Sequence, residues 1–259
     1  MVLLTFDIEE FDVPLEYGMN ITLEDQIEIS KCGTSIILDL LKTMDVKATF
    51  FCTVTFAKSA SEIINRIINE GHELASHGMS HATFHSNDLA ISKNELEIMF
   101  EVNIKGFRMP RMGAVDINAL QQAGYRYNSS INPTYIPGRY NALNKPRTIF
   151  IENDVIQIPT SVTPIFRFPL FWLSFHILPL KIYTWLTNIT LWSDKYIHLY
   201  FHSWEFIELC DGYYNLPKYI TKNTGKKMTI RLQKFIETKK KNKHNFIGIS
   251  DFLSRTTTK

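Results

Sequence analysis

The chain of 259 residues has few cysteines, little net charge and no long uninterrupted apolar run. Its three cysteines, Cys32, Cys52 and Cys210, include no CxxC pair. This odd, scattered set argues against a disulfide framework and suits a reducing compartment, and we expect each cysteine to be a small buried hydrophobe. The formal net charge is +2, and the one basic concentration, residues 239–244, is expected to be a solvated helix end, the alternative being a patch for nucleic acid or membrane. We therefore expect no nucleic-acid partner.

The sequence also lacks a recognisable signal peptide, an internal repeat and a low-complexity linker. Residues 1–7 carry no basic n-region and are too short for an apolar h-region, so they are expected to begin a strand. We therefore expect a cytoplasmic protein with a single domain over residues 1–259. With 45% hydrophobic residues, a chain of this length can bury a sizeable core.

Aromatic and apolar residues concentrate between Phe166 and Trp192. A membrane span needs about 20 apolar residues. Here Arg167, Lys181 and two prolines interrupt the run. We expect an aromatic-rich insertion at about 164–192 that forms a pair of core-packing helices or a covering loop. The alternative is a shallow, peripheral contact with the inner face of a membrane, because aromatic and basic residues suit an interface.

Strand and helix patterns alternate along the chain. Short apolar runs predict strands, and apolar residues three and four positions apart predict helices. The expected strands are 2–6, 47–54, 72–77, 105–110, 150–159, 198–204 and 245–249. The expected helices are 26–43, 61–70, 88–102, 116–124 and 226–240. This alternation predicts an α/β fold with a mostly parallel sheet, closed as a barrel or doubly wound.

Polar clusters follow four of the predicted strands, where parallel α/β folds place their active face. The first cluster is Asp7, Glu9 and Glu10. Buried carboxylates are costly unless they are paired or bind a metal, although a solvated strand end remains the alternative. Because successive side chains of a strand point to opposite faces, Asp7 and Glu9 should share a face and Glu10 should turn away.

The second cluster pairs His77 with His81. At positions i and i+4 the two imidazoles would lie on one side of a helical turn, close enough to bind one metal. Gly78 between them permits a tight turn. In a chain with eight histidines, a chance pair at this spacing is the alternative. His72 and His85 have other spacings and are expected to be structural or exposed.

The third and fourth clusters hold Arg108 and His202. Arg108 stands two residues before Pro110 and could hold a carboxylate bidentately, the alternative being an ordinary surface arginine. His202 ends an aromatic strand. It could serve as a general acid or base because histidine titrates near neutrality, the alternative being a satisfied core histidine.

With these clusters in order, the chain resembles the polysaccharide deacetylase family, also called NodB-homology or carbohydrate esterase family four. The likeness covers about residues 3–207 and lies in five stretches, 5–10, 76–81, 106–111, 124–130 and 200–205. It implies a distorted (β/α) barrel of about seven strands and a divalent metal, usually zinc. It also implies hydrolysis of an N-acetyl group from a hexosamine in a polysaccharide or a glycan precursor, so the expected partner is a glycan or a lipid-linked sugar.

The resemblance also implies roles by position. Asp7 would be the general base, Arg108 the residue that holds it, and His202 the general acid. His77 and His81 would be metal ligands. Two further residues are expected to bind substrate, Arg111 and Trp204.

The chain departs from the family pattern at two positions. Many members carry a metal-binding aspartate directly after the base, where this chain has Ile8. Other relatives use Asp-x-Asp, which gives the ligand role to Glu9, the residue that strand alternation also favours, with Glu10 as the fallback. The fourth motif has Asn128 in place of the usual aspartate. The motifs do not reveal an acidic partner for His202.

Two rival functions stay open on the sequence alone. One is another amide hydrolase on the same scaffold, either a deformylase acting on a lipid-linked amino sugar or a ureide hydrolase. The other is a catalytically inactive glycan-binding module, which the departures at Ile8 and Asn128 favour.

Overall fold

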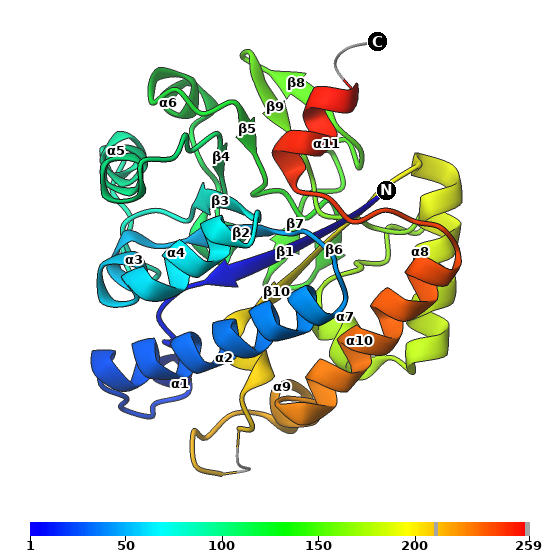
Figure 1. Cartoon of the computed structure of the whole chain (residues 1–259). Coiled ribbons are helices and arrows are strands. Elements are labelled where there is room, and N and C mark those ends of the chain that lie inside the picture. The colour runs from blue at the N-terminus through cyan, green and yellow to red at the C-terminus, as the bar shows by residue number, and fades with distance from the viewer. Residues whose placement is uncertain (210–211, 257–259) are drawn as a thin grey trace.

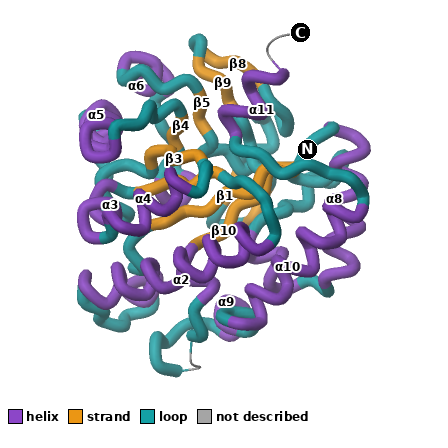
Figure 2. Tube along the Cα trace, in the orientation of Figure 1, coloured by secondary structure: helices purple, strands orange, loops and turns teal. Residues whose placement is uncertain are grey.

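A curved sheet of eight strands forms the centre of the protein, and helices line its outside (Figures 1 and 2). The structure, a computed structural model, describes residues 1–209 and 212–256, so the prediction for Cys210 lies outside the described residues. The strand order is β10-β1-β2-β3-β4-β5-β9-β8. The strands are β1 (Val2–Ile8), β2 (Thr49–Cys52), β3 (Glu73–Ser76), β4 (Gly106–Phe107), β5 (Tyr127–Asn128), β8 (Phe150–Glu152), β9 (Val155–Gln157) and β10 (Ile197–His202).

The helices connect these strands and pack around them. They are α1 (Val13–Glu16), α2 (Leu23–Thr43), α3 (Val54–Ser59), α4 (Ser61–Asn69), α5 (Asp88–Phe100), α6 (Ile117–Gln122), α7 (Trp172–Ile177), α8 (Leu180–Asp194), α9 (Lys218–Thr221), α10 (Lys226–Lys241) and α11 (Ile249–Thr256). Two 3-10 turns, η1 (Pro110–Met112) and η2 (Ser203–Phe206), and a small hairpin of β6 (Tyr135–Ile136) and β7 (Tyr140–Asn141) complete the described elements.

The predicted α/β fold is confirmed. From β10 to β9 the sheet neighbours are parallel, which gives seven parallel strands, and β8 adds an antiparallel eighth. The sheet curls toward closure: Ser161, just after β9, donates its backbone N–H to the carbonyl of His198 on β10 at 2.9 Å. The result is the distorted, partly open barrel that the motifs implied.

The register of β1 against β10 positions the polar residues of the sheet. Thr5 pairs with Tyr200 and Asp7 with His202, so these side chains lie on one face of the sheet. On the other face, Leu4 and Phe6 belong to the main hydrophobic core between the sheet and its helices. Because both faces are covered, every residue of β1 is buried. Asp7 and His202 lie 195 residues apart in sequence but side by side here.

Several helix ends are stabilised by local caps. The side chain of Asp116 caps α6 by accepting the N–H of Asn118 at 2.9 Å. Gly71 follows α4 with a φ of +75°, the left-handed conformation that glycine adopts at helix ends. The same kind of cap begins α2, where Thr22 accepts the N–H of Asp25.

Two strand predictions are wrong. Residues 150–159 form a hairpin rather than one strand, because Asn153 and Asp154 both take positive φ and make a two-residue turn. Residues 245–249 form only an isolated bridge between Phe246 and Val2. There the N–H groups of Ile249 and Ser250 are bound by side chains of β2 and β3 instead of a strand, and α11 begins.

The aromatic-rich segment 164–192 forms a turn followed by α7 and α8. Phe175 and Tyr183 face inward and are fully buried, which confirms the interpretation as core-packing helices. In Figure 1, α8 and α10 run side by side at the right of the molecule. No helix among the described residues is long and apolar enough to span a membrane.

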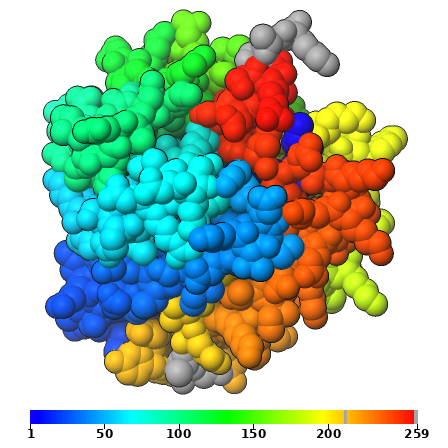
Figure 3. All heavy atoms as spheres, viewed as in Figure 1, coloured from blue at the N-terminus to red at the C-terminus, as the bar shows by residue number. Residues whose placement is uncertain are grey.

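Two predictions about the burial of side chains are wrong. Cys52 is buried as expected, but Cys32 is exposed, because it lies on the outer face of α2 beside Glu28. In the basic stretch 239–244, Lys239 is buried rather than solvated: its ammonium donates to Thr187 Oγ1 at 2.8 Å and links α10 to α8. The C-terminal segments coloured orange and red in Figure 3 accordingly pack closely against the rest of the chain.

Candidate metal and catalytic site

A pocket of about 240 Å³ opens where β1 and β10 end and the loop after β3 begins. Polar and aromatic side chains share its wall, the mixture expected of a site that binds a polar ligand with an apolar body. Its lining includes Asp7, Glu9, His77, His81, Arg111, Arg139, Tyr140, Trp172, Tyr200, His202 and Trp204.

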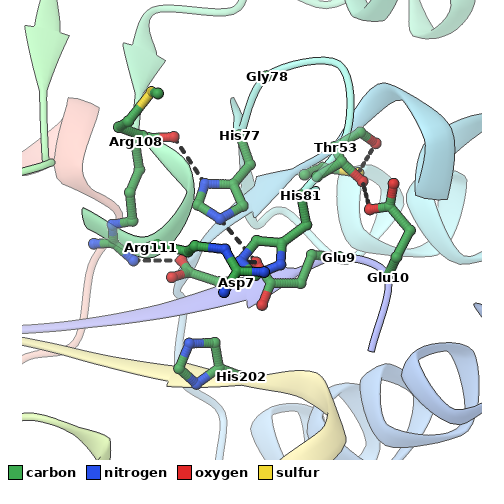
Figure 4. Close-up of polar contacts among 12 residues, drawn as sticks. Asp7, Glu9, Glu10, Thr53, His77, Gly78, His81, Arg108, Arg111 and His202 are labelled. Carbon is green, nitrogen blue, oxygen red and sulfur yellow. Dashed lines mark hydrogen bonds and ion pairs between the residues drawn. The ribbon is translucent and has the colours of Figure 1, made fainter. Parts of the chain in front are cut away.

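Glu9, His77 and His81 converge in this pocket (Figure 4). One ligand atom from each lies within 4.8 Å of the others, and all three side chains are buried. Glu9 Oε2 lies 2.8 Å from His77 Nε2 and 3.4 Å from His81 Nε2. Glu10 points away, and its carboxylate accepts the hydroxyl of Thr53 at 2.7 Å. The structure thus brings together the acid and the two histidines predicted to be ligands.

The hydrogen bonds of the two imidazoles fit a metal site. His77 Nδ1 lies 2.8 Å from the carbonyl of Arg108, and His81 Nδ1 lies 2.7 Å from Asp12 Oδ1. Both partners only accept, so each Nδ1 carries the hydrogen and each Nε2 of a neutral ring presents its lone pair to Glu9. Acceptor would then face acceptor, an arrangement that a cation between them satisfies. Two imidazole nitrogens and one carboxylate oxygen form a possible metal site.

The electrostatics of the same residues show how strongly they interact. Burial alone would raise the pKa of Glu9, but the facing His81 and His77 lower it to about 2. Burial would lower the pKa of His81, but Glu9 and Asp12 raise it to about 9. Without an ion in the pocket, these carboxylates favour a proton on the His81 ring, and a bound metal cation would take the place of that proton at Nε2.

The loop that carries the histidines is not helical. The prediction of a helical turn at His77–His81 is wrong, because residues 77–81 form no helix and Gly78 takes a φ of +84°. The left-handed residue turns the chain sharply, so the two rings still lie nearly parallel with centroids 6.1 Å apart. The glycine that suggested a tight turn is the residue that makes it.

Arg108 holds Asp7 at the bottom of the pocket. Arg108 is fully buried, and its Nη1 donates to Asp7 Oδ1 at 2.5 Å. Its Nη2 donates to Thr5 Oγ1 at 2.9 Å and to Ser129 Oγ at 2.7 Å. The guanidinium lies 4.0 Å from the centroid of the Phe51 ring. These contacts hold the Arg108 guanidinium in place, and the guanidinium in turn fixes the orientation of the Asp7 carboxylate.

His198 supports Arg108, and no motif singled it out. It lies on β10 two and four residues before Tyr200 and His202, on the same face. Its Nδ1 donates to the carbonyl of Pro159 at 3.1 Å, so its Nε2 accepts from Arg108 Nη2 at 3.0 Å. Burial, and then the charge of Arg108, lower the pKa of His198 to about 3. The signal available in the sequence was period-2 spacing with His202.

His202 has the acidic partner that the motifs did not reveal. Glu205 Oε1 accepts from His202 Nδ1 at 2.9 Å and from the His202 backbone N–H at 2.6 Å. Burial would lower the pKa of His202, but the hydrogen bond to Glu205 and the charge of Glu9 raise it. The sequence signal was a glutamate three residues after the histidine, in a stretch that forms the 3-10 turn η2. Trp204 stacks on the imidazole, with centroids 5.1 Å apart.

The remaining predicted residues lie at the rim or outside the pocket. Arg111 is half exposed at the rim, where it donates to Asp12 Oδ2 at 2.9 Å and pairs with Glu16. Asp12, which sequence reasoning missed, thus joins His81 to Arg111. Asn128 does not line this pocket: it donates to Gln157 Oε1 at 2.8 Å and accepts from Ser130.

Comparison with known proteins matches the N-terminal part of the chain to one family model. Residues 1–128, just under half of the chain, match the model for polysaccharide deacetylases. A segment of 48 residues is 44% identical to a chitooligosaccharide deacetylase of a Bradyrhizobium strain, covering 18% of this chain and 22% of that protein. A segment of 64 residues is 41% identical to an uncharacterised 30.6 kDa protein of Geobacillus stearothermophilus, covering 25% of this chain and 24% of that protein. The matched segments therefore span about a quarter of these curated relatives.

Solved structures match over nearly the whole chain. A protein of Mycobacterium smegmatis described as a polysaccharide deacetylase is 17% identical with a TM-score of 0.65, over 99% of this chain and 90% of that one. A PuuE allantoinase is 13% identical with a TM-score of 0.60, and the match covers 95% of this chain and 86% of that one. A pseudoenzyme of carbohydrate esterase family four from Bacillus anthracis is 14% identical with a TM-score of 0.54, and the match covers 97% of this chain and 64% of that one. At these identities the likeness shows a shared fold.

The resemblance to the polysaccharide deacetylase family is thereby confirmed, and with it the predicted barrel-like fold. The predicted enzyme class, hydrolases acting on carbon–nitrogen bonds other than peptide bonds, is that of this family, whose members act on glycans.

Proposed function

We propose that this protein is a divalent-metal-dependent hydrolase that removes an N-acetyl group from an amino sugar of a polysaccharide or a glycan precursor. One observation carries the proposal. A single pocket holds the Glu9–His77–His81 triad together with Asp7, held by Arg108, and His202, held by Glu205. Hydrolysis of an amide needs these three functions, a cation site, a base and an acid, within reach of one bond.

The donor set favours zinc as the bound ion. Two imidazole nitrogens and one carboxylate oxygen are a common zinc set in catalytic sites that keep a position open for water. When bound, the ion would polarise the acetyl carbonyl and lower the pKa of water toward about 7. Glu9, His77 and His81 would hold it, and Asp12 and the Arg108 carbonyl would orient the two rings.

The protein residues supply the proton transfers. Asp7, oriented by its ion pair with Arg108, takes a proton from the attacking water. The water oxygen bonds to the acetyl carbon, and the carbon–nitrogen bond breaks as His202 Nε2 gives its proton to the departing amine. Because Glu205 binds Nδ1, Nε2 is the nitrogen left for the substrate. The products are acetate and a free amino sugar.

The aromatic wall suits a sugar ring. Trp172, Tyr200 and Trp204 line the pocket, and Trp172 packs edge-on against His202 with centroids 5.3 Å apart. Such side chains offer an apolar surface to the carbon face of a sugar and exclude water from the acid. Trp204 and the rim residue Arg111 are the substrate contacts that we propose.

The test is a product assay with matched variants. Purified protein is analysed for bound metal and incubated with N-acetylglucosamine oligomers of increasing length, with acetate as the readout. We expect Asp7→Asn to keep its metal and lose roughly a hundredfold or more in kcat, whereas His77→Ala loses both metal and activity. Full activity after complete removal of metal would contradict the proposal. Formate release from a formylated amino sugar, or opening of a ureide ring, would show that the protein is one of the rival hydrolases. Sugar binding without product would identify a binding module.

We also propose that α8 makes the peripheral membrane contact predicted for residues 166–192. Three apolar side chains on its outer face, Ile182, Trp185 and Trp192, are 47%, 60% and 79% exposed. Lys181 and Lys195 flank them at the two ends of the helix, a pattern that suits an anionic lipid surface. Such a contact would favour a lipid-linked sugar as substrate.

Liposome co-sedimentation tests this contact. We expect binding to vesicles that contain anionic lipid, weakened in the Trp185→Ala, Trp192→Ala double variant with acetate release unchanged on a soluble oligomer. Wild-type protein that stays entirely in solution would refute it. A cytoplasmic location at the inner face of the membrane stays a prediction, supported by the free thiols of Cys32 and Cys52.

A further inference from the structure

Three polar side chains, two of them completely buried, form a continuous series of hydrogen bonds that starts at the pocket. His202 Nδ1 lies 2.9 Å from Glu205 Oε1, and Glu205 Oε2 lies 2.7 Å from His176 Nε2. The side chains of Glu205 and His176 are completely buried. His176 belongs to α7, in the aromatic-rich segment, and takes no direct part in the proton transfers proposed for Asp7 and His202.

Both oxygens of Glu205 are engaged. Oε1 binds two donors of His202, its ring and its backbone N–H, and Oε2 binds His176. A buried carboxylate needs such donors because it has left water. Burial by itself raises the pKa of Glu205, but the hydrogen bonds from His176 and His202 more than offset that effect and lower it. His176 thus helps to keep the partner of His202 ionised.

The hydrogen bonding of His176 is one-sided. Because a carboxylate only accepts, His176 Nε2 must carry the hydrogen that it gives to Glu205. Its Nδ1 is buried and has no hydrogen-bond partner among the described residues. A buried nitrogen without a partner costs free energy, and a leucine at this position would avoid that cost. The hydrogen bond to Glu205 is therefore the contact by which this imidazole stabilises the structure.

The helix that carries His176 is anchored firmly enough to hold it. Arg231 Nη2, from α10, donates to the carbonyls of Phe175 and Leu178 at 2.7 Å and 2.8 Å. Asn223 donates to the carbonyl of His176 itself. On the same helix, Trp172 packs against the His202 ring. Helix α7 therefore contacts His202 directly through Trp172 and indirectly through His176 and Glu205.

We propose that His176 is a positioning residue which, through Glu205, keeps the His202 imidazole in the orientation and tautomer that directs Nε2 toward the substrate amine. The inference rests on the proposed function for the role of His202 in turnover, but not for the hydrogen-bonded chain itself. The proton that reaches the amine comes from His202 Nε2, and Glu205 stays ionised throughout.

Other charged groups face this chain and must be kept constant. Asp7 of β1 and Glu9, which follows that strand, act on His202. Glu205 and Arg231 of α10 both act on Tyr183 of α8. With His176 removed, Glu205 Oε2 loses its donor and the pKa of Glu205 rises. His202 then faces a less charged partner and its own pKa falls, so the alkaline limb of the rate profile moves to lower pH.

Three variants separate positioning from mere packing. His176→Leu removes the donor at similar volume. His176→Gln restores an N–H group at the position of Nε2. Phe175→Leu perturbs the buried face of α7 without touching Glu205, since Phe175 packs against Tyr183, Phe201 and Phe235. Each variant is characterised by thermal unfolding, by kcat and KM over pH, and by NMR titration of the His202 imidazole in the full chain.

We expect His176→Leu to lower kcat by roughly tenfold or more with little change in KM, and to move both the alkaline limb and the NMR titration of His202 to lower pH. His176→Gln should recover most of both effects, and Phe175→Leu should lower the melting temperature alone. An unchanged His202 titration in His176→Leu would overturn the proposal, as would a shift of equal size in Phe175→Leu. If no substrate is turned over, the proposed function fails, while the NMR titration still decides the role of His176.

Discussion

Asp12 shows how a single residue outside the ligand set controls the site. Its Oδ1 accepts from His81 Nδ1 at 2.7 Å and its Oδ2 from Arg111 at 2.9 Å. The first contact fixes the tautomer of His81, and the second reaches a half-exposed arginine at the rim. A carboxylate behind a ligating histidine raises the basicity of that ligand and holds its ring in place.

We therefore expect Asp12→Asn to weaken divalent-metal binding by roughly 10- to 100-fold, measured by calorimetric titration of metal-stripped protein. Glu16→Gln is the matched control, because Glu16 also pairs with Arg111 but makes no contact with His81. Equal losses in the two variants would mean that Arg111, rather than His81, transmits the effect.

At the scale of elements, α2 is packed against η2, the turn that carries Trp204 and Glu205. Gly33 makes this approach possible: a Cβ at that position would lie 2.0 Å from the backbone oxygen of Ser203. Ser30, one turn earlier on α2, is also buried. The distance between helix and turn is thus set by one residue without a side chain.

Gly33→Ala should lower the free energy of unfolding by about 1–3 kcal/mol, because backbone atoms cannot move aside as a side chain does. It should also reduce activity, since η2 holds Glu205 against His202. Chemical denaturation checks the first effect and acetate release the second. Ser30→Ala, at a hydroxyl without a hydrogen-bond partner among the described residues, should be nearly neutral. A neutral Gly33→Ala would refute this view of the packing.

The pH dependence of stability belongs to the whole molecule. His198 has a pKa lowered to about 3 from an ordinary value of 6.5, by burial and then by Arg108. Between these pH values the unfolded chain binds a proton that the folded chain does not. The free energy of unfolding therefore falls as pH decreases below 6.5, by up to about 1.4 kcal/mol per pH unit from this one residue.

His198→Asn tests this linkage, because asparagine can still donate to Pro159 but does not titrate. We expect the variant to be less stable than wild type at neutral pH, yet to lose less stability between pH 6.5 and about 4. Denaturant unfolding at a series of pH values gives the slopes. Identical slopes in the two proteins would show that His198 is not the group responsible.

Much of this organisation could be predicted from the sequence, and the limits have physical causes. Strand alternation was enough to separate Glu9 from Glu10, since both follow one continuous strand. The spacing of His77 and His81 identified the pair but not its backbone, because Gly78 allows a sharp turn that brings the rings together without a helix. Local patterns thus identified the residues whose orientation is set within their own strand or loop.

The residues that support the site could not be predicted from the sequence, because their positions depend on contacts between distant segments. The pairing of β1 with β10 brings Asp7 to His202, and only this pairing makes His198 a neighbour of Arg108. His176 reaches Glu205 across 29 residues through the packing of α7. The prediction of a strand at 245–249 was wrong for a similar reason, because side chains from β2 and β3 accept hydrogen bonds from the N–H groups that a strand would have used.

The metal content of Glu9→Gln, compared with that of Glu10→Gln, tests the proposed metal site most directly. The two glutamates are adjacent and both are buried, but only Glu9 faces His77 and His81, while Glu10 binds Thr53. After saturation with zinc and dialysis, elemental analysis should find about one equivalent of metal in the wild type and in Glu10→Gln, and a loss of most of it in Glu9→Gln. Retention of a full equivalent by Glu9→Gln, or its loss from Glu10→Gln alone, would contradict the proposed Glu9–His77–His81 site.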